Sequence, residues 1–487
     1  MSINNWRTGA LLLCALALAA GADELHTVEI TATRLPRASL DVAASVDVVA
    51  PRRDALGINL SESLSAVPGL SIHDRQNYAQ DAQLSIRGFG ARSAFGIRGV
   101  RLLVDDIPAT QPDGQGQISQ LNLAAIDRIE VLRGPYSALY GNSSGGVVQL
   151  HTADGAGVPS VSADAVVGPD AMHRLGLRSA GAIESRGLDY HIAYTRFDTV
   201  GQRGHSAAQR DSLQAKLGVA LNDHARLRLL FNWLRAPDTE DALGLTAAQF
   251  AADPWQSAPP AVQFNTRKST SQRQVGAVLD IDTDRWGAWH AMLYGGVRGI
   301  QQFLAIPTSV QADPRHSGGV VALATDYGGG EARWSRNWDT RRGQVSVVAG
   351  STYDLLRQRR RGYENFIGAT VGIAGALRRD ERDDVSAWDQ YVQLEWPVAS
   401  MLKATVGARH SSIHFDSRDH YIRTGNPDDS GRAVYSATTP VASLLWHAGP
   451  RTSVYVTTGQ GFETPTFAEL AYRTDGRAGL HLSLIHI

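Results

Sequence analysis

Residues 126–150 read IDRIEVLRGPYSALYGNSSGGVVQL, and this stretch decides the fold of the first third of the chain. Its apolar side chains predict short strands at Ile126–Arg133 and Gly145–His151. The glycines at positions 141, 145 and 146 predict tight turns around the second strand. We therefore expect two short strands separated by a glycine-rich segment.

The sequence before this stretch has the same character. Short strands are predicted at Gln83–Arg87 and Val100–Val104, again with glycine-rich turns between them. A helix is predicted over residues 59–67, because its leucine and valine side chains recur on one face and a Pro-Gly pair follows. Residues 40–153 are therefore predicted to form a compact α+β domain.

Composition excludes several classes of protein. The chain has 487 residues with 47 basic and 48 acidic side chains, a balance unlike that of nucleic-acid-binding proteins. The single cysteine, Cys14, excludes an intrachain disulfide and any CxxC-type metal site. The mean hydropathy of −0.20 leaves no room for a bundle of membrane helices, so any crossing of a bilayer must use strands.

The sequence carries no motif of enzymatic chemistry. Gly88 and Gly90 are not followed by a third glycine that opens a helix, and no P-loop, GxSxG or HExxH motif occurs. We therefore expect no enzyme activity, no catalytic residue, no metal-ligand set and no cofactor.

The N-terminus predicts export. Arg7 precedes an unbroken apolar run at residues 10–20, and Ala20-Gly21-Ala22 has the small-residue form of a cleavage site. An apolar run of this length is too short to span a bilayer, which favours a signal peptide at residues 1–22.

Four motifs then resemble the plug domain of TonB-dependent outer-membrane receptors. They occur in order as QLSIRGFG (83–90), LLVDDIP (102–108), IDRIEVLRGP (126–135) and ALYGNSSGGVV (138–148). Residues 87–117 further resemble the iron-complex branch of this family. The resemblance implies that residues 40–153 are a plug, and we use this name for them below.

The resemblance also bears on the interpretation of residues 23–39. On its own, the β-prone peptide after the cleavage site is either a frayed terminus or a strand that pairs with the sheet edge of another protein. The resemblance favours the second interpretation and implies a TonB box, followed by a linker, at Thr27, Val28, Glu29, Ile30, Thr31, Ala32 and Thr33.

Residues 154–487 alternate apolar and polar side chains in about thirteen segments of about ten residues. In residues 188–194, Leu188, Tyr190 and Ile192 point one way and Asp189 and His191 point the other. This period of two, with aromatic residues near segment ends, is typical of membrane β-barrels, although one segment alone would also fit a soluble sandwich. The predicted fold is mainly β, with an α+β plug inside a transmembrane antiparallel β-barrel.

The predicted connections alternate between short and long. Residues 221–224 predict a tight turn, which should face the periplasm, and the long polar loops should face outside the cell. The long loops are predicted at residues 236–270, 307–329, 363–380 and 416–431. Plugged transporters have 22 strands, so the sequence predicts a fragment with a partial barrel, and residues 480–487 are doubtful as native sequence.

The predicted function is that of a TonB-dependent receptor and active transporter for a ferric siderophore or another iron complex in the outer membrane. Its expected partners are TonB, a ferric chelate and outer-membrane lipid, and not nucleic acid. The alternatives are a passive porin-like channel, or TonB-dependent uptake of cobalamin, haem or a sugar. A signalling transducer is disfavoured, because the predicted TonB box follows the cleavage site directly.

Two sets of site residues follow. The plug apex, expected at residues 89–97 and 109–117, supplies candidate ligand-binding residues at Arg87, Arg92, Arg98, Arg101, Asp113 and Gln115. Arginine suits an anionic chelate because its planar fork forms paired hydrogen bonds, but these arginines could equally pair with carboxylates of the barrel wall. Glu130 and Arg133 are expected to form a salt-bridge latch between the plug and the barrel strands.

Overall fold

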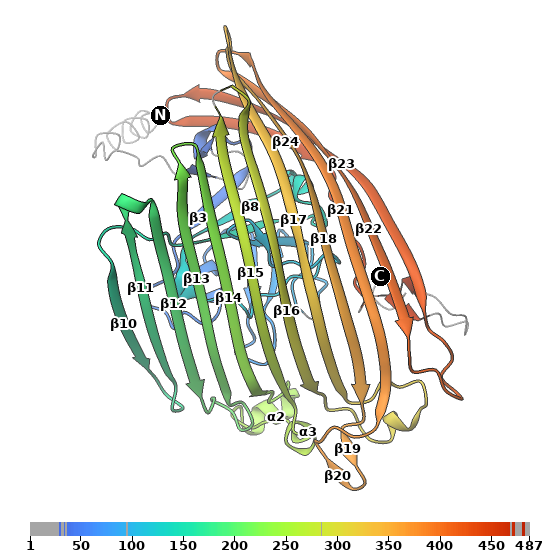
Figure 1. The fold of residues 1–487 in the computed structure, drawn as a ribbon. Helices are drawn as coiled ribbons and strands as arrows, with labels where there is room; N and C mark the ends of the chain where they lie inside the picture. The colour runs from blue at the N-terminus through green and yellow to red at the C-terminus, as the bar shows by residue number, and fades with distance from the viewer. Residues whose placement is uncertain are drawn as a thin grey trace, which may run out of the picture.

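The computed structural model describes residues 29–30, 34, 37–93, 96–283, 285–467, 470–472 and 480–482. A large antiparallel sheet curves around an inner domain, which is the plug (Figure 1). The sheet has thirteen strands, which confirms the predicted number. They are β10 (Ser160–Val167), β11 (His173–Ile183), β12 (Leu188–Thr199), β13 (Ala208–Asn222), β14 (Ala225–Glu240), β15 (Arg267–Thr283), β16 (Gly287–Phe303), β17 (Val320–Thr340), β18 (Gly343–Tyr363), β21 (Leu377–Ala399), β22 (Leu402–Asp419), β23 (Gly431–Gly449) and β24 (Thr452–Gly459).

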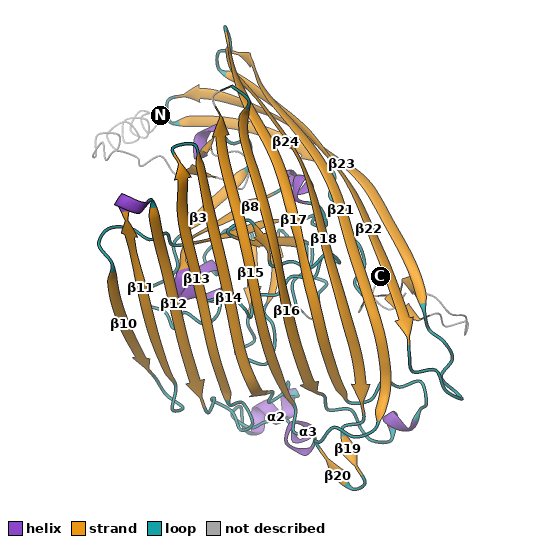
Figure 2. Cartoon of the chain, in the orientation of Figure 1, coloured by secondary structure: helices purple, strands orange, loops and turns teal. Residues whose placement is uncertain are grey.

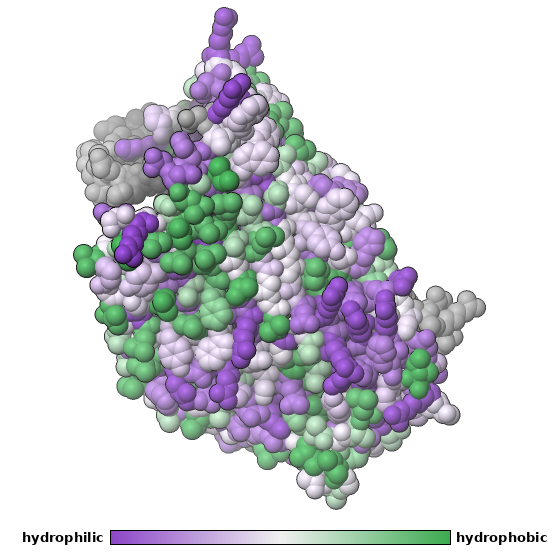
Figure 3. All heavy atoms as spheres, viewed as in Figure 1, coloured by the Kyte–Doolittle hydropathy of each residue, from purple (hydrophilic) through white to green (hydrophobic). Residues whose placement is uncertain are grey.

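Burial along these strands is opposite to that of a soluble protein. On β12, Asp189, His191 and Thr195 are buried against the inside, whereas Ile192 on the outer face is 41% exposed. Figure 3 shows apolar residues spread over the visible outer face of the sheet. A polar inner face and an apolar outer face are the arrangement that a lipid environment requires.

Most strands are longer than the predicted ten residues. β17 has 21 residues and β21 has 23, so parts of the predicted loops 307–329 and 363–380 are strand. Residues 378–384 of β21, for example, are all charged, yet residues 379–384 pair in register with β18. Pairing continues beyond the apolar band because backbone hydrogen bonds do not depend on which side chains face lipid.

The connections alternate as predicted, with short turns at one end of the sheet and long loops at the other (Figure 2). Turns of two residues join β13 to β14, β17 to β18, β21 to β22 and β23 to β24. The long-loop end carries residues 241–266, 304–319, 364–376 and 420–430. These loops hold α2 (Ala247–Ala252), α3 (Pro259–Gln263), the 3₁₀ turn η5 (Val310–Ala312), β19 (Phe366–Ile367) and β20 (Thr370–Val371).

The plug contains a mixed sheet in the order β3-β8-β9-β6-β7, in which β6 and β9 run parallel. Its strands are β3 (Ser45–Val49), β6 (Val100–Val104), β7 (Ile107–Pro108), β8 (Ile126–Arg133) and β9 (Gly146–Thr152), beside the pair β4 (Leu70–His73) and β5 (Gln83–Ile86). Its helical turns are α1 (Ser61–Leu64), η1 (Ser39–Asp41), η2 (Leu123–Ala125) and η3 (Pro135–Tyr140). The four predicted strands are confirmed to within one residue at each end, whereas β3 and β4 were not predicted and the predicted helix is shorter.

The plug has its own core and also packs on the wall. Leu64, Ile86 and Ile129 are fully buried in a cluster made of plug residues. A second cluster joins Leu139 of η3 to Leu445 of β23, across the boundary between plug and sheet. The plug is therefore a domain with a hydrophobic core of its own, around which the sheet curves.

The two edges of the sheet are β10 and β24. Beyond β24 the chain leaves the sheet and crosses onto the plug, where Phe462 pairs with Ser143. Two short strands follow, β25 (Leu470–Tyr472) and β26 (Leu480–Leu482); residues 483–487, part of the segment doubted above, lie outside the described residues. No helix in the described part of the chain is long and apolar enough to cross a membrane.

Candidate functional site

Charged side chains of the N-terminal part of the chain form ion pairs with side chains on the inner face of the sheet. In the described part of the chain, six ion pairs formed by arginine or lysine connect residues 34–106 to the sheet, and nearly all of their groups are largely buried. They are Arg34–Glu331, Arg37–Glu395, Asp81–Lys268, Arg101–Asp354, Asp105–Lys216 and Asp106–Arg228. Each barrel partner faces inward because it occupies the buried phase of the two-residue alternation.

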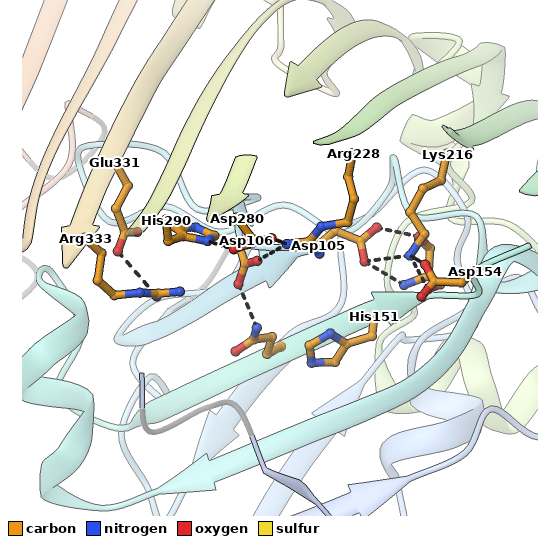
Figure 4. Close-up of polar contacts among 12 residues, drawn as sticks. Asp105, Asp106, His151, Asp154, Lys216, Arg228, Asp280, His290, Glu331 and Arg333 are labelled. Carbon is orange, nitrogen blue, oxygen red and sulfur yellow. Dashed lines mark hydrogen bonds and ion pairs between the residues drawn. The ribbon is translucent and has the colours of Figure 1, made fainter. Parts of the chain in front are cut away.

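The tip of the β6–β7 hairpin is inserted into this boundary (Figure 4). Asp105 and Asp106 both have positive φ, at 46° and 71°, a conformation that costs about 1 kcal/mol or more for a residue with a side chain. Asp105 accepts hydrogen bonds from the backbone amide of Thr152 at 3.0 Å and from Lys216 Nζ at 3.5 Å. These contacts offset the backbone strain and hold the hairpin tip against β13.

Asp106 lies within a ring of charged groups from three strands. Arg228 donates to Asp106 at 3.4 Å and to Asp280 at 2.8 Å, and His290 lies 2.7 Å from Asp280 (Figure 4). Burial alone would raise the pKa of Asp106, but the positive charges of His290, Arg228 and Arg333 lower it. The carboxylate is therefore held in its charged form at neutral pH.

A cavity of about 650 Å³ lies beside this ring at the short-turn end. Its lining includes Arg34, Arg226, Asp280, His290 and Arg333. The cavity therefore lies between Arg34 of the N-terminal segment and the inner face of the sheet, and strands β14–β17 each contribute charged or titratable side chains to its lining.

The N-terminal segment is fixed to the sheet at the same end. Arg34 donates to both carboxylate oxygens of Glu331, at 2.8 Å and 3.0 Å, and its guanidinium lies 4.0 Å from the ring centroid of Tyr140. Burial raises the pKa of Tyr140 to about 12. Arg37 donates to Ser346 at 2.6 Å and to Glu395 at 3.1 Å, close to the short turns.

Part of the predicted TonB box is described. β1 (Glu29–Ile30) pairs with β2 (Arg37–Ala38) of its own chain, Glu29 opposite Ala38 and Ile30 opposite Arg37. The other predicted members, Thr27, Val28, Thr31, Ala32 and Thr33, lie outside the described residues.

The predicted ligand-binding arginines have different surroundings. Arg92 is half-exposed and pairs with Glu463 at 3.1 Å, on the segment that follows β24. Arg98 is buried and donates to the backbone carbonyls of Asp113 and Thr464, at 3.1 Å and 2.6 Å. Arg101 pairs with Asp354 of β18 at 3.2 Å, which is the barrel-wall pairing that the sequence had left as the alternative.

The remaining candidates are Arg87, Asp113 and Gln115. Arg87 is exposed, and its backbone amide donates to the carbonyl of Gly69. The backbone amide of Gln115 donates to the side chain of Asp113 at 3.1 Å, so these two residues share one turn. The structure therefore brings Arg98, Asp113 and Gln115 together.

The expected latch residues pair inside the plug. Glu130 lies 3.3 Å from Arg128 and 3.1 Å from His151, and Arg133 forms an ion pair with Asp47 of β3. These partners differ from the predicted barrel strands because β8 lies between β3 and β9, whose side chains surround it. Four of the ion pairs above, those of Asp81, Arg101, Asp105 and Asp106, connect the plug to the barrel.

Sequence reasoning missed most of those six pairs, although one signal was present. Lys216 and Arg228 are cations within alternating segments, on the face opposite the apolar side chains, and such positions face the interior of a barrel. Nothing in the sequence identified their partners on the plug.

Curated transporters and receptors are similar to this chain in sequence. A vitamin B12 transporter BtuB from Photobacterium profundum is 29% identical over 234 residues, which are 45% of this chain and 37% of the relative. A pesticin receptor from Yersinia enterocolitica is 33% identical over 152 residues, 30% of this chain and 21% of the relative. The chain thus spans well under half the length of these relatives.

Solved structures share the fold. The ferric citrate transporter FecA in its unliganded form superposes with a TM-score of 0.74 at 21% identity, covering 87% of this chain and 64% of that one. The ferric yersiniabactin uptake receptor FyuA from Yersinia pestis gives 0.66 at 17% identity, covering 86% and 65%.

Two families match directly. Residues 39–148 match the TonB-dependent Receptor Plug Domain, and residues 212–482 match the TonB dependent receptor-like beta-barrel. The second match alone covers more than half of the chain. Members are outer-membrane β-barrel receptors and transporters rather than enzymes, and the chain belongs to this TonB-dependent receptor family.

Proposed function

We propose that the protein is an active transporter that carries a ferric siderophore or another iron complex across the outer membrane. The observation that carries this proposal is the independently cored plug inside a sheet whose outer face is apolar. A plug of this kind blocks free diffusion, so passage of a large ligand requires work on the plug.

The work would come from TonB through the N-terminal segment. We infer export by the signal peptide at residues 1–22 and capture of the TonB box at Thr27–Thr33. Arg34 and Arg37 support this inference. They follow the predicted box in the chain and bind the sheet at its short-turn end, opposite the long loops. A pull on the segment would therefore act first on these contacts.

An iron complex is favoured as the ligand by the solved structures that share the fold. Their descriptions name ferric citrate and ferric yersiniabactin. The curated relatives include vitamin B12 transporters, which makes cobalamin the second candidate. A passive channel is disfavoured, because four ion pairs, those of Asp81, Arg101, Asp105 and Asp106, fasten the plug to the wall.

Growth on defined nutrients tests the ligand. The full-length gene would be expressed in a strain that lacks its own outer-membrane iron and cobalamin receptors. Rescue on one ferric chelate, but not on limiting vitamin B12, is the expected result. Rescue only on vitamin B12 would replace the iron proposal by the cobalamin alternative.

A further inference from the structure

Three cations face the plug at the long-loop end of the sheet. Arg210 is the third residue of β13, Lys268 the second of β15, and Arg298 lies five residues before the end of β16. All three occupy the inward phase of their strands, as the burial of Ser212, Thr270 and Met292 in the same phase indicates. The plug residues that they meet are therefore those nearest the long loops.

The plug residue Asp81 forms an ion pair with one of these three cations. Asp81 pairs with Lys268 at 2.8 Å, with side-chain exposures of 17% and 12%. Burial alone would raise the pKa of Asp81, but the charges of Lys268 and Arg298 lower it. Asp81 is therefore charged at neutral pH and acts as the counter-ion of this region.

The two arginines are held by neutral groups. Arg298 donates to the side chains of Gln272 and Ser119, at 2.6 Å and 2.8 Å. Arg210 donates to the backbone carbonyls of Ile58 and Leu121. Glu62 also lies near Arg210, but its oxygens accept hydrogen bonds from the backbone amides of residues 57–59.

The carboxylates nearest Arg210, those of Glu62 and Asp81, are therefore engaged by other groups. Among the described residues, no ion pair joins Arg210 or Arg298 to a carboxylate, and the Nε atom of each is buried without a hydrogen-bond partner. Buried charge without an opposite charge is costly, which favours binding of an anion here.

A cavity separates the plug from the wall at this place. Its volume is about 70 Å³, and Tyr78, Asp81, Phe197, Arg210 and Lys268 are among its lining residues. This is room for one carboxylate-sized group between the two cations, or for about two water molecules. An anionic group that entered the cavity would meet Lys268 directly.

The plug segment that carries Asp81 is fastened by few polar contacts. Asn77 and Gln80 donate to Asp241, just beyond β14, at 2.7 Å and 2.5 Å. Asp81 supplies the charged contact to β15. Loss of the pair with Lys268 would therefore leave residues 77–81 held to the wall by the hydrogen bonds to Asp241 and by the packing of Tyr78 on Phe197 of β12.

We propose that Asp81 occupies the position that an anionic oxygen of the transported chelate takes. A carboxylate, hydroxamate or catecholate oxygen would exchange with Asp81 at Lys268, with Arg210 and Arg298 adding attraction. The exchange keeps Lys268 paired and releases residues 77–81 from the wall, so that occupancy alters the plug. This inference rests on the proposed function and assigns its ligand a negative charge.

Asp81→Asn tests the exchange, because it removes the competing charge and keeps the side-chain shape. Binding to the purified full-length protein is measured by fluorescence quenching, with anionic ferric dicitrate and neutral ferric tris(acetohydroxamate) as probes. We expect ferric dicitrate to bind about tenfold more tightly to Asp81→Asn, the size of one charge-assisted contact. The neutral probe should bind equally to both proteins.

Asp54→Asn is the matched control. Asp54 also pairs with an arginine of the plug, Arg52, but both side chains are more than half exposed. This variant should bind both probes as the unsubstituted protein does. An equal or weaker affinity of Asp81→Asn for ferric dicitrate would overturn the inference.

Hydrogen exchange gives a readout that needs no ligand. In Asp81→Asn, and also in Lys268→Met, the amides of residues 77–81 should exchange faster, while those of β8 and β9 keep their protection. Unchanged exchange at residues 77–81 would overturn the inference and leave iron transport standing. If neither ferric probe binds the unsubstituted protein while labelled vitamin B12 does, the iron proposal fails and the anionic-chelate inference fails with it.

Discussion

Arg34 lies 2.8 Å and 3.0 Å from the two carboxylate oxygens of Glu331, 297 residues away along the chain. Its guanidinium also lies between the rings of Tyr140 and Tyr391, at 4.0 Å and 4.8 Å from their centroids. One side chain therefore joins the N-terminal segment, the plug and the inner face of the sheet.

The first prediction concerns this contact. Arg34→Gln removes one charge of a buried pair and should cost about 3–5 kcal/mol in the free energy that holds the segment to the wall. Hydrogen exchange at the amides of Arg37 and Ala38 should become faster. Arg52→Gln, at an exposed pair, is the control and should leave that exchange unchanged; equal exchange in Arg34→Gln would show that the contact does not anchor the segment.

The second prediction concerns TonB capture. Ile30→Pro removes a backbone donor and fixes φ, so strand addition at the TonB box should fail. Ligand binding should persist while uptake is lost, as measured with a radiolabelled chelate in whole cells. Full uptake by the variant would refute the assignment of the box.

The third prediction concerns pH. The pKa values of Asp81 and Asp106 are lowered in the folded protein, so their stabilisation is complete above the unfolded value of about 3.9 and is lost as the pH falls through the folded values. The plug should therefore loosen from the sheet in acid. Protease sensitivity at about pH 3 should rise in the unsubstituted protein.

A double variant, Asp81→Asn with Asp106→Asn, provides the control for the acid effect. It lacks both titrating groups, so its protease sensitivity should depend less on pH and should already be raised at neutral pH. An identical pH profile in the two proteins would mean that other groups cause the acid response.

The fourth prediction concerns the plug apex. Arg92 is half-exposed and pairs with Glu463, so Arg92→Ala should leave the melting temperature nearly unchanged, as expected for a surface pair. If Arg92 binds an anionic chelate, affinity should fall about 10- to 150-fold, and the loss should depend on salt. Unchanged affinity at both low and high salt would remove Arg92 from the ligand site.

Much of the fold could be predicted from the sequence, because its signals are local. Alternation such as that of Leu188 to Tyr194 depends on which face meets lipid, and β6 and β8 begin and end at their predicted residues. The ends of the long strands could not be predicted. In residues 378–384 charged side chains replace the alternation, so pairing with β18 and, from residue 381, with β22 keeps them extended.

The site was harder to predict, because its contacts join residues far apart in the chain. Asp105 and Asp106 were visible within a plug motif, but their partners Lys216 and Arg228 lie more than a hundred residues away. The pairing of Glu130 with Arg128 and His151 was not predicted for the same reason: the position of Glu130 between β3 and β9 is a property of the sheet order.

Uptake of iron-55 supplied as a ferric chelate tests the central claim most directly. Cells that lack other outer-membrane iron receptors would express the full-length protein, with or without TonB and with or without a proton gradient. The account predicts accumulation that requires the protein, TonB and the gradient together. Accumulation that persists after TonB is deleted or the gradient is collapsed would contradict it.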